Sequence, residues 1–298
     1  MEKSTKVRRI VNKTTMYFLY AVLIIQCIST LIPIVWMVFT AGKGYVEYYS
    51  NPFLWPKKWR FENFTMAFQN IKLTVREGKK VIEYGVLDMA GTSVIYAFLS
   101  SGWSTMWTAL VAYVLAKYKF RGGEFIYMLG IIVWITPVIG STPSAMLIKK
   151  ALGIYDNLVL LVLTNVATAF AGFNFLLLYG SFKRLPWSYA EAAFMDGAGH
   201  FTVLTKVFLP MMTPTCMVLF VLGFLGAWND YGTFLVWLPS SPNLAYGVYE
   251  FQLNLQAYGG NICQVMAGFA MISVPTAILY LCTQKLIVDK FQVGGLKG

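Results

Sequence analysis

Residue types that could do chemistry gather in one short stretch of this chain, EAAFMDGAGHFTVLTKVFLP, which runs from Glu191 to Pro210. Two carboxylates, Glu191 and Asp196, stand there among alanine and glycine residues, between two strongly hydrophobic segments. Small side chains let the surface of a partner approach closely, and a carboxylate beside them can pair with a basic residue of that partner. The stretch therefore indicates a docking surface that fits into a socket.

Catalytic and metal chemistry find little support in the sequence. His200 is the single histidine, which excludes a histidine-cluster metal site or proton relay, and we interpret it as a surface residue of the same region. The cysteines are scattered without a C-x-x-C pair and make neither a disulfide framework nor a metal site: Cys27, Cys216, Cys263 and Cys282. The pattern G-x-x-x-x-G-K followed by Ser or Thr does not occur, so the chain lacks the loop that cradles nucleotide phosphates. We therefore expect no catalytic residue, no metal and no cofactor bound by this chain.

The elements that position the stretch belong to a membrane protein. Of the 298 residues, 57% are hydrophobic and only 12% are charged, whereas about a quarter of the residues of a soluble domain are charged. The mean hydropathy is +0.60. The net charge of +11 is spread over loops and both tails, which favours topology control and contact with anionic membrane lipid over binding of nucleic acid.

The fold class that we predict is an all-α integral membrane protein with six transmembrane helices. About 20 apolar residues cross the hydrocarbon core as a helix, and long charge-free runs favour helices over barrel strands. Six stretches qualify, and only the fifth contains a charged residue, Asp230: Met16–Val38, Ser93–Leu115, Phe125–Ile148, Leu158–Phe182, Met211–Val236 and Gln264–Thr283. The first is preceded by basic residues but is too long for the apolar region of a signal peptide.

The orientation follows from the lysine and arginine residues of the loops. With both termini in the cytoplasm, most of them lie inside, and the two short outer loops carry only Lys149 and Lys150. The exception is the long aromatic outer segment 41–92, which holds several basic residues and which we expect to fold against the outer membrane surface. We predict one membrane domain, residues 1–298, composed of a cytoplasmic tail 1–15, the outer segment 41–92, a cytoplasmic loop 183–210 and an outer loop 239–263.

The cytoplasmic loop is expected to contain two short helices. Helix formers run from Trp187 to Met195, and Gly197 then ends the helix as glycine commonly does. A second helix is expected over Ala198–Leu209, stopped by Pro210. On the first helix, spacings of three and four place small residues on one flat face for a partner: Ala190, Ala193 and Gly197.

Other candidate positions admit two interpretations each. Asn229 and Asp230 near the outer end of the fifth span suit either a functional site or a helix cap. Asn165 and Asn174 are nine residues apart and fall on opposite faces of a continuous helix, so both cannot line one pathway, and interhelical hydrogen bonds are the simpler role.

The third span offers a similar choice. Trp134 and the Thr136-Pro137 break mark either a bend in a pathway or a packing kink. The outer loop 239–263 mixes aromatic and amide side chains, which suits contact with a sugar or a polar protein surface; a solvated loop explains that composition equally well.

One family unites these features. The pattern E-A-A-x2-D-G-A-x10-L-P resembles the signature cytoplasmic loop of permease subunits of binding-protein-dependent ABC importers, and it is met by Glu191, Ala192, Ala193, Asp196, Gly197, Ala198, Leu209 and Pro210. Four further segments are similar to the carbohydrate branch, close to the maltose-type permeases: AYVLAKYKFRG (112–122), FNFLLLYGSFKRLP (173–186), WND (228–230) and KFQVGGLKG (290–298). The resemblance runs from about Ser93 to the end of the chain.

The resemblance implies a translocation subunit of an ATP-driven carbohydrate importer, with an oligosaccharide as the expected substrate, in a bacterial or archaeal cytoplasmic membrane. The implied partners are a second permease subunit, two ATPase subunits that hold ATP and Mg, and an extracytoplasmic sugar-binding protein. The coupling contact would comprise Glu191, Ala192, Ala193, Gly197 and Ala198, with Asp196 capping or bracing the turn. Pathway candidates are Trp134, Asn174, Trp228, Asn229 and Asp230, and candidates for contact with the binding protein are Tyr246, Tyr249, Gln252, Asn254 and Tyr258.

Two other classes of function compete with this one. A self-contained secondary transporter or channel would use membrane-embedded carboxylates or repeated half-helices, and only Asp230 qualifies. A membrane-embedded enzyme would need clustered His, Asp or Glu within the spans, and the sequence has no such cluster.

Overall fold

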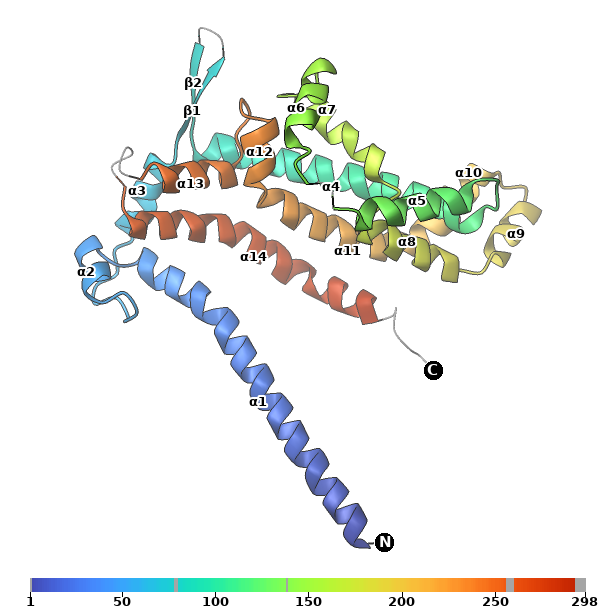
Figure 1. The fold of residues 1–298 in the computed structure, drawn as a ribbon, viewed down its shortest axis with the longest axis horizontal. Coiled ribbons are helices and arrows are strands. Elements are labelled where there is room, and N and C mark those ends of the chain that lie inside the picture. The colour runs from blue at the N-terminus through green and yellow to red at the C-terminus, as the bar shows by residue number, and fades with distance from the viewer. Residues whose placement is uncertain (1, 78–79, 138, 256–259, 293–298) are drawn as a thin grey trace. The chain divides into compact units, whose positions relative to one another are not determined.

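The computed structural model describes residues 2–292 except 78–79, 138 and 256–259 (Figure 1). It divides into two compact units. The N-terminal unit comprises residues 1–71 and 251–271, and the main unit comprises residues 72–250 and 272–298. The predicted single membrane domain stays a prediction.

The N-terminal unit is built on one long helix. α1 (Glu2–Ala41) includes the predicted cytoplasmic tail as well as the first predicted span, so the tail is helical. Two short helices follow, α2 (Tyr45–Ser50) and α3 (Glu62–Asn70). Two helices cross from one unit into the other along the chain: α13 (Leu244–Leu253) and α14 (Ile262–Gln292).

The main unit is organised around α4 (Val86–Lys117), which packs against α11 (Leu209–Trp228) and α8 (Phe173–Arg184). Figure 1 shows α4 and α11 running along one another. The remaining elements are β1 (Leu73–Glu77), β2 (Lys80–Tyr84), α5 (Gly123–Ile135), α6 (Thr142–Ala151), α7 (Leu158–Leu163), the 3-10 helix η1 (Thr164–Thr168), α9 (Ser188–Met195), α10 (His200–Val203), the π-helix η2 (Leu204–Phe208) and α12 (Tyr231–Trp237).

The outer segment corrects the all-α prediction. Its second half forms an antiparallel hairpin in which Leu73 pairs with Tyr84 and Val75 pairs with Ile82. Lys72, which directly precedes β1, forms an ion pair of 2.6 Å with Glu83 of β2. Residues 73–84 alternate between apolar and polar side chains and include β-branched ones, a pattern that favours strands. The prediction missed this short pattern because it was based on the long apolar runs elsewhere in the chain.

Several helices are suited to crossing a membrane by length and composition. Within the described residues, three do so alone: Thr15–Ala41, His200–Trp228 and Ile262–Lys285. A fourth span can be formed by Leu158–Thr168 together with Phe173–Arg184, a pair bent by 53°. The chain is therefore a multi-pass membrane protein. α4 has the length of a span, but serine, threonine and glycine make it less hydrophobic than the other three.

The third predicted span is not one helix, and its interruption confirms the break that the sequence predicts at Thr136-Pro137. α5 ends at Ile135, where the N–H of Thr136 still bonds to the carbonyl of Ile132. Pro137 lacks a donor and disfavours helical geometry at the residue before it, and Gly140 has a φ of +74°. The chain therefore turns and restarts as α6, with Pro143 in the first turn.

The fourth predicted span is also interrupted. The break lies between η1 and α8, at residues 169–172, and Gly172 has a φ of +91°. The angular relation between Asn165 and Asn174 that a continuous helix predicts is therefore wrong. Asn165 donates from Nδ2 to the Ser100 hydroxyl on α4 at 3.1 Å, which confirms an interhelical role for this residue.

The fifth predicted span differs at both ends. Pro210 does not stop the helix, because α10, η2 and α11 follow one another without a gap from His200 to Trp228. Pro210 directly follows a π-helical turn, and the wider backbone of that turn accommodates a residue without an N–H inside the continuous helix. At the far end the helix stops at Trp228 and the chain restarts as α12.

Candidate coupling site and translocation path

The E-A-A stretch folds as a short helix with a well-formed end. α9 runs over Ser188–Met195, and Gly197 follows it with a φ of +79°. The N–H of Gly197 bonds to the carbonyl of Phe194 at 3.0 Å, and that of Ala198 bonds to Ala193 at 3.0 Å. This hydrogen-bond pair is a Schellman motif, which needs a left-handed residue that glycine supplies without strain. The predicted helix end is confirmed.

The exposed face of α9 is not the face that the spacing suggested. Ala190 has no exposed surface and Ala193 is half-buried, because this side packs onto the rest of the main unit. The interpretation of Ala190 as part of a flat docking face is therefore wrong. Glu191 and Ala192 are exposed, together with Asp196 and Gly197 at the end of the helix. A partner would meet these four residues first.

Two carboxylates, Glu191 and Asp196, lie on this face. Within the described residues, neither Glu191 nor Asp196 makes a side-chain hydrogen bond or an ion pair. Asp196 terminates α9 through its backbone N–H, which bonds to the carbonyl of Ala192 at 3.2 Å. Both side chains are therefore available to a partner. In the described part of the chain, no group of His, Cys, Asp and Glu is arranged to hold a metal ion.

An aromatic cluster beneath α9 holds the helix in place. The Trp187 ring stacks on Phe208 with centroids 6.3 Å apart and lies 6.1 Å from Phe194. Phe194 in turn meets His200 edge to face at 4.9 Å. Phe208 is fully buried and belongs to the π-helical turn that leads into α11. Phe208 thereby joins the packing beneath α9 to the start of α11.

The C-terminal end of α4 contacts the same loop. The Tyr118 hydroxyl lies 2.9 Å from Nδ1 of His200, and it also lies 3.2 Å from the Tyr113 hydroxyl. The Lys117 ammonium donates to the carbonyl of Leu185 and lies 5.1 Å from the centre of the Phe208 ring. Burial lowers the pKa of the Lys117 amine. His200 is thus a tether between two helices, a role that its position in the sequence did not reveal.

Two large apolar side chains flank the exposed face of α9. Met195 is 88% exposed and Phe201 is 77% exposed, although both are hydrophobic. A residue of this kind near the rim of a docking surface adds apolar contact area once a partner covers it. Sequence reasoning missed both residues, because the motif specifies alanine, glycine and acidic positions and leaves positions 195 and 201 unspecified.

The body of α5 approaches the break between η1 and α8. A Cβ on Gly130 of α5 would lie 2.1 Å from the carbonyl oxygen of Phe170, so glycine allows the break between η1 and α8 to come close. Trp134, one turn further along α5, reaches to about 4.0 Å from the Cβ position of Gly172. Asn174 is exposed at the start of α8. Trp134 therefore lies against the break between η1 and α8, and Asn174 lies just after that break.

The other three pathway candidates lie at the end of α11. Trp228 is buried, and its indole N–H donates to the carbonyl of Ile272 at 3.3 Å, so its described role is packing. Asn229 is exposed and donates to the carbonyl of Leu225 at 2.9 Å. The Asp230 carboxylate accepts from the N–H of Thr233 at 2.9 Å and caps α12. The helix-cap interpretation of Asp230 is confirmed.

The outer loop is more ordered than a solvated loop. Its centre forms α13, and Asn243 before the helix is buried. The Asn243 side chain accepts from the N–H of Tyr246 at 2.8 Å and donates to the carbonyl of Asp230 at 3.0 Å. Tyr249 stacks on Tyr231 with ring centroids 4.4 Å apart. Gln252 and Asn254 are exposed, and Tyr258 lies outside the described residues.

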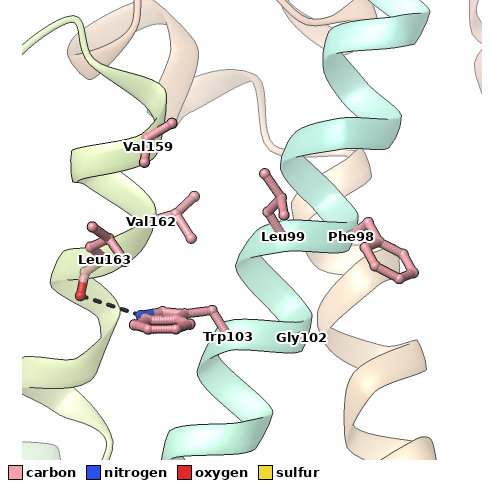
Figure 2. Close-up of a pocket in the computed structure, with 7 residues that line it drawn as sticks. All are labelled: Phe98, Leu99, Gly102, Trp103, Val159, Val162 and Leu163. Carbon is pink, nitrogen blue, oxygen red and sulfur yellow. Dashed lines mark hydrogen bonds between the residues drawn. The ribbon is translucent and has the colours of Figure 1, made fainter.

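A groove of about 300 Å³ lies between α4 and α7 (Figure 2). Figure 2 shows the Trp103 indole turned toward the carbonyl of Leu163, to which it donates at 3.4 Å. All other lining side chains are apolar or glycine: Phe98, Leu99, Gly102, Val159, Val162 and Leu163. Such walls cannot replace the hydrogen bonds that a sugar makes with water. None of the pathway candidates lines this groove.

Comparison with known proteins decides the family. Residues 108–292 match the family described as binding-protein-dependent transport system inner membrane component. The chain belongs to this family. The matched region contains the whole E-A-A loop and confirms the resemblance that the motif predicted.

Two relatives extend over most of the chain. The diacetylchitobiose uptake system permease protein NgcG of Streptomyces coelicolor is 27% identical over 281 residues, which cover 92% of this chain and 87% of the relative. The arabinooligosaccharides transport system permease protein AraQ of Halalkalibacterium halodurans is 30% identical over 209 residues, which cover 70% of this chain and 73% of the relative.

A solved structure shares the fold. A chain from the crystal structure of a bacterial ABC transporter involved in the import of the acidic polysaccharide alginate superposes with a TM-score of 0.69 at 22% identity. The superposition covers 90% of this chain and 95% of that chain.

Proposed function

We propose that this chain is a translocation subunit of an ATP-driven importer that moves a carbohydrate, an oligosaccharide in particular, across the cytoplasmic membrane of a bacterium or archaeon by alternating access. The observation that carries the proposal is the E-A-A helix, which is capped, packed on an aromatic cluster and exposed at Glu191 and Ala192. Membership of the binding-protein-dependent family and the names of the relatives, which are sugar permeases, support it.

Coupling would pass through α9 to the helices of the membrane domain. Closure of a separate ATPase dimer moves a helix that is inserted in its cleft, and α9 is tied to α4 through Tyr118 and His200 and to α11 through Phe208. A rigid connection of this kind transmits a displacement because packed side chains deform little. ATP and Mg belong to the ATPase subunits, and this chain binds no cofactor and catalyses no reaction.

The proposed assembly has two permease subunits, this chain and a homologous one, with two ATPase subunits and an extracytoplasmic sugar-binding protein. Six spans with both termini in the cytoplasm place the E-A-A loop on the ATPase side. Trp134 and Asn174, at the breaks of two helices, are the pathway residues that the geometry favours, since irregular backbone at membrane depth lines a cavity or is covered by protein. The exposed Gln252 and Asn254 of the outer loop suit contact with the binding protein.

The assembly and its ATP dependence are tested by co-purification followed by uptake. The tagged chain is expressed with its partner subunits, purified and reconstituted in vesicles with a binding protein and labelled oligosaccharides. We expect an ATPase subunit to co-purify and uptake to require ATP. A Glu191→Lys variant should lose both, whereas Glu124→Lys, at an exposed acidic residue in the first turn of α5, should retain them. Uptake driven by an ion gradient without any ATPase would support the secondary-transporter alternative instead.

A further inference from the structure

The segment that follows α1 is tied to the end of a membrane span. α1 is apolar over Thr15–Ala41, a length of about 40 Å at 1.5 Å per residue, which exceeds the hydrocarbon thickness of about 30 Å. Its last two turns therefore lie where the hydrocarbon meets the lipid headgroups. The amide of Asn63 donates to the carbonyls of Ala41 and Lys43, both at 2.7 Å. Residues 42–63 consequently cannot drift away from this level into water.

Part of this segment folds back along the span. The indole N–H of Trp36 donates to the carbonyl of Pro52 at 3.0 Å, and the Trp36 and Phe53 rings are 6.4 Å apart. Trp55 packs on Phe39 with ring centroids 4.4 Å apart. Trp36 lies five residues before the end of α1, or about 7 Å along the helix axis. Residues 51–55, here called the fold-back, thus lie beside the final turns of α1.

A buried lysine holds the fold-back in place. Lys43 has no exposed surface, and its ammonium donates to the carbonyls of Asn51 and Pro52, both at 2.9 Å. A buried cation is costly unless it is hydrogen-bonded, so this arrangement is stable only with the fold-back in its observed position. The N–H of Arg60 bonds to the carbonyl of Gly42 at 2.8 Å and closes the segment.

The fold-back exposes apolar side chains, and basic residues follow it along the chain. Phe53 is 80% exposed, Leu54 is 63% exposed and Trp55 is 62% exposed, although burial of such side chains is favourable by about 1.5–3 kcal/mol each. Lys57, Lys58 and Arg60 are exposed directly after them, with Glu62 as the neighbouring exposed acid, while Glu47 accepts the backbone N–H of Lys57 at 2.6 Å. Aromatic residues backed by basic ones match the boundary between acyl chains and phosphate groups.

We propose that residues 51–55 insert into the lipid leaflet at the C-terminal end of α1, with Phe53, Leu54 and Trp55 at the depth of Trp36 and with the basic residues on lipid phosphates. The bilayer is favoured as the occupant because the fold-back is directed along the span, whereas a water-soluble binding protein approaches from beyond the end of α1. The choice of the outer leaflet rests on the proposed topology; the insertion itself does not depend on transport activity.

The test is a depth measurement by spin labelling of the intact complex in lipid nanodiscs. The four native cysteines are replaced by alanine, and single labels are placed by Leu54→Cys and, as the control, by Val81→Cys, an exposed apolar residue on the β-hairpin. We expect the label at position 54 to collide more with oxygen than with a water-soluble nickel chelate and the label at position 81 to show the reverse order.

Two results would overturn the proposal. Equal preference for the nickel chelate at both positions would mean that the fold-back lies in water. Exclusion of both collision partners at position 54 would mean that a protein subunit covers it. A second measurement addresses the cations. We expect phosphatidylglycerol to be enriched over phosphatidylcholine around the label at position 54, and Lys57→Gln combined with Lys58→Gln should abolish this enrichment. Unchanged enrichment in the double variant, or its absence in the wild type, would contradict the assignment of these lysines to lipid phosphate.

Discussion

The predicted cytoplasmic loop and the predicted outer segment use aromatic residues in opposite ways. In the cytoplasmic loop, Trp187 and Phe208 are packed beneath α9, and small or acidic residues face outward. In the outer segment, a buried cation and backbone carbonyls form the interior, and Phe53 and Trp55 face outward. Aromatic residues therefore serve as a rigid base in one region and as the contact surface in the other.

The difference indicates what each region meets. A surface of small residues and carboxylates suits a shaped protein socket, where fit and charge pairing decide affinity. A surface of large aromatic residues without a complementary shape suits a fluid lipid leaflet, where burial of area is sufficient. Mutations in the two regions should consequently affect different observables.

The largest effect is expected from Trp187→Ala, which is compared with Trp55→Ala as a separate single variant. Trp187→Ala removes a half-buried ring that packs on Phe194 and Phe208, and its cost is a part of the about 3–5 kcal/mol that the loss of a fully buried aromatic ring costs. We expect α9 to lose its position and the ATPase subunit to be lost on purification. Trp55→Ala, at an exposed ring, should leave ATPase retention unchanged. Equal retention in both variants would contradict the distinction between base and contact surface.

Removal of the buried cation should affect only the outer segment. Lys43→Met keeps the length of the side chain but leaves the carbonyls of Asn51 and Pro52 without their donor, at a cost of about 1–3 kcal/mol. Hydrogen exchange of residues 42–63 should become faster, while exchange in α9 stays as in the wild type. Unchanged exchange in residues 42–63 would show that Lys43 does not hold the fold-back.

The turn after α9 offers a matched pair of substitutions. Gly197 has a φ of +79°, and no atom lies within 4 Å of its Cβ position, so backbone strain rather than a clash inside the chain sets the cost. Gly197→Val should lower ATP-dependent uptake, because a β-branched residue in the left-handed region costs about 1–2 kcal/mol or more. Gly197→Asn tolerates this region and should retain more uptake. The same loss for both would point to contact of the side chain with the ATPase instead of strain.

The smallest effect concerns the tether between α4 and the coupling loop. Tyr118→Phe and His200→Phe each remove one partner of a hydrogen bond of 2.9 Å, which contributes about 1 kcal/mol. In a double-mutant cycle, the ratio of sugar transported to ATP hydrolysed should fall with either substitution and fall little further with both. Tyr189→Phe, an exposed tyrosine on α9, is the control. Additive losses would mean that the two residues act separately.

Sequence reasoning succeeded where a motif or a long apolar run determines the local structure. The end of α9 at Gly197 follows from residue type, and the membrane character follows from composition. The break at Thr136-Pro137 was likewise predicted, and α5 ends there. Sequence reasoning failed at Pro210, which was expected to stop a helix and is instead accommodated by a π-helical turn, although the two prolines have the same local chemistry.

The face of α9 shows a second limit. Spacing placed Ala190 and Ala193 on one side of the helix, but only the position of the aromatic cluster decides that this side is the buried one. The ties of Lys43 to Asn51 and Pro52 were likewise invisible, since a lysine in a loop is usually exposed to water.

The central claim is that α9 presents one particular face to an ATPase subunit. Single cysteines at Ala192, on the exposed face, and at Ala190, on the buried face, can be treated with a short crosslinker in the assembled complex in membranes. We predict a crosslink to the ATPase subunit from Ala192→Cys and none from Ala190→Cys. Absence of a crosslink from Ala192→Cys, while the complex is intact, would contradict the docking of this helix in the ATPase cleft.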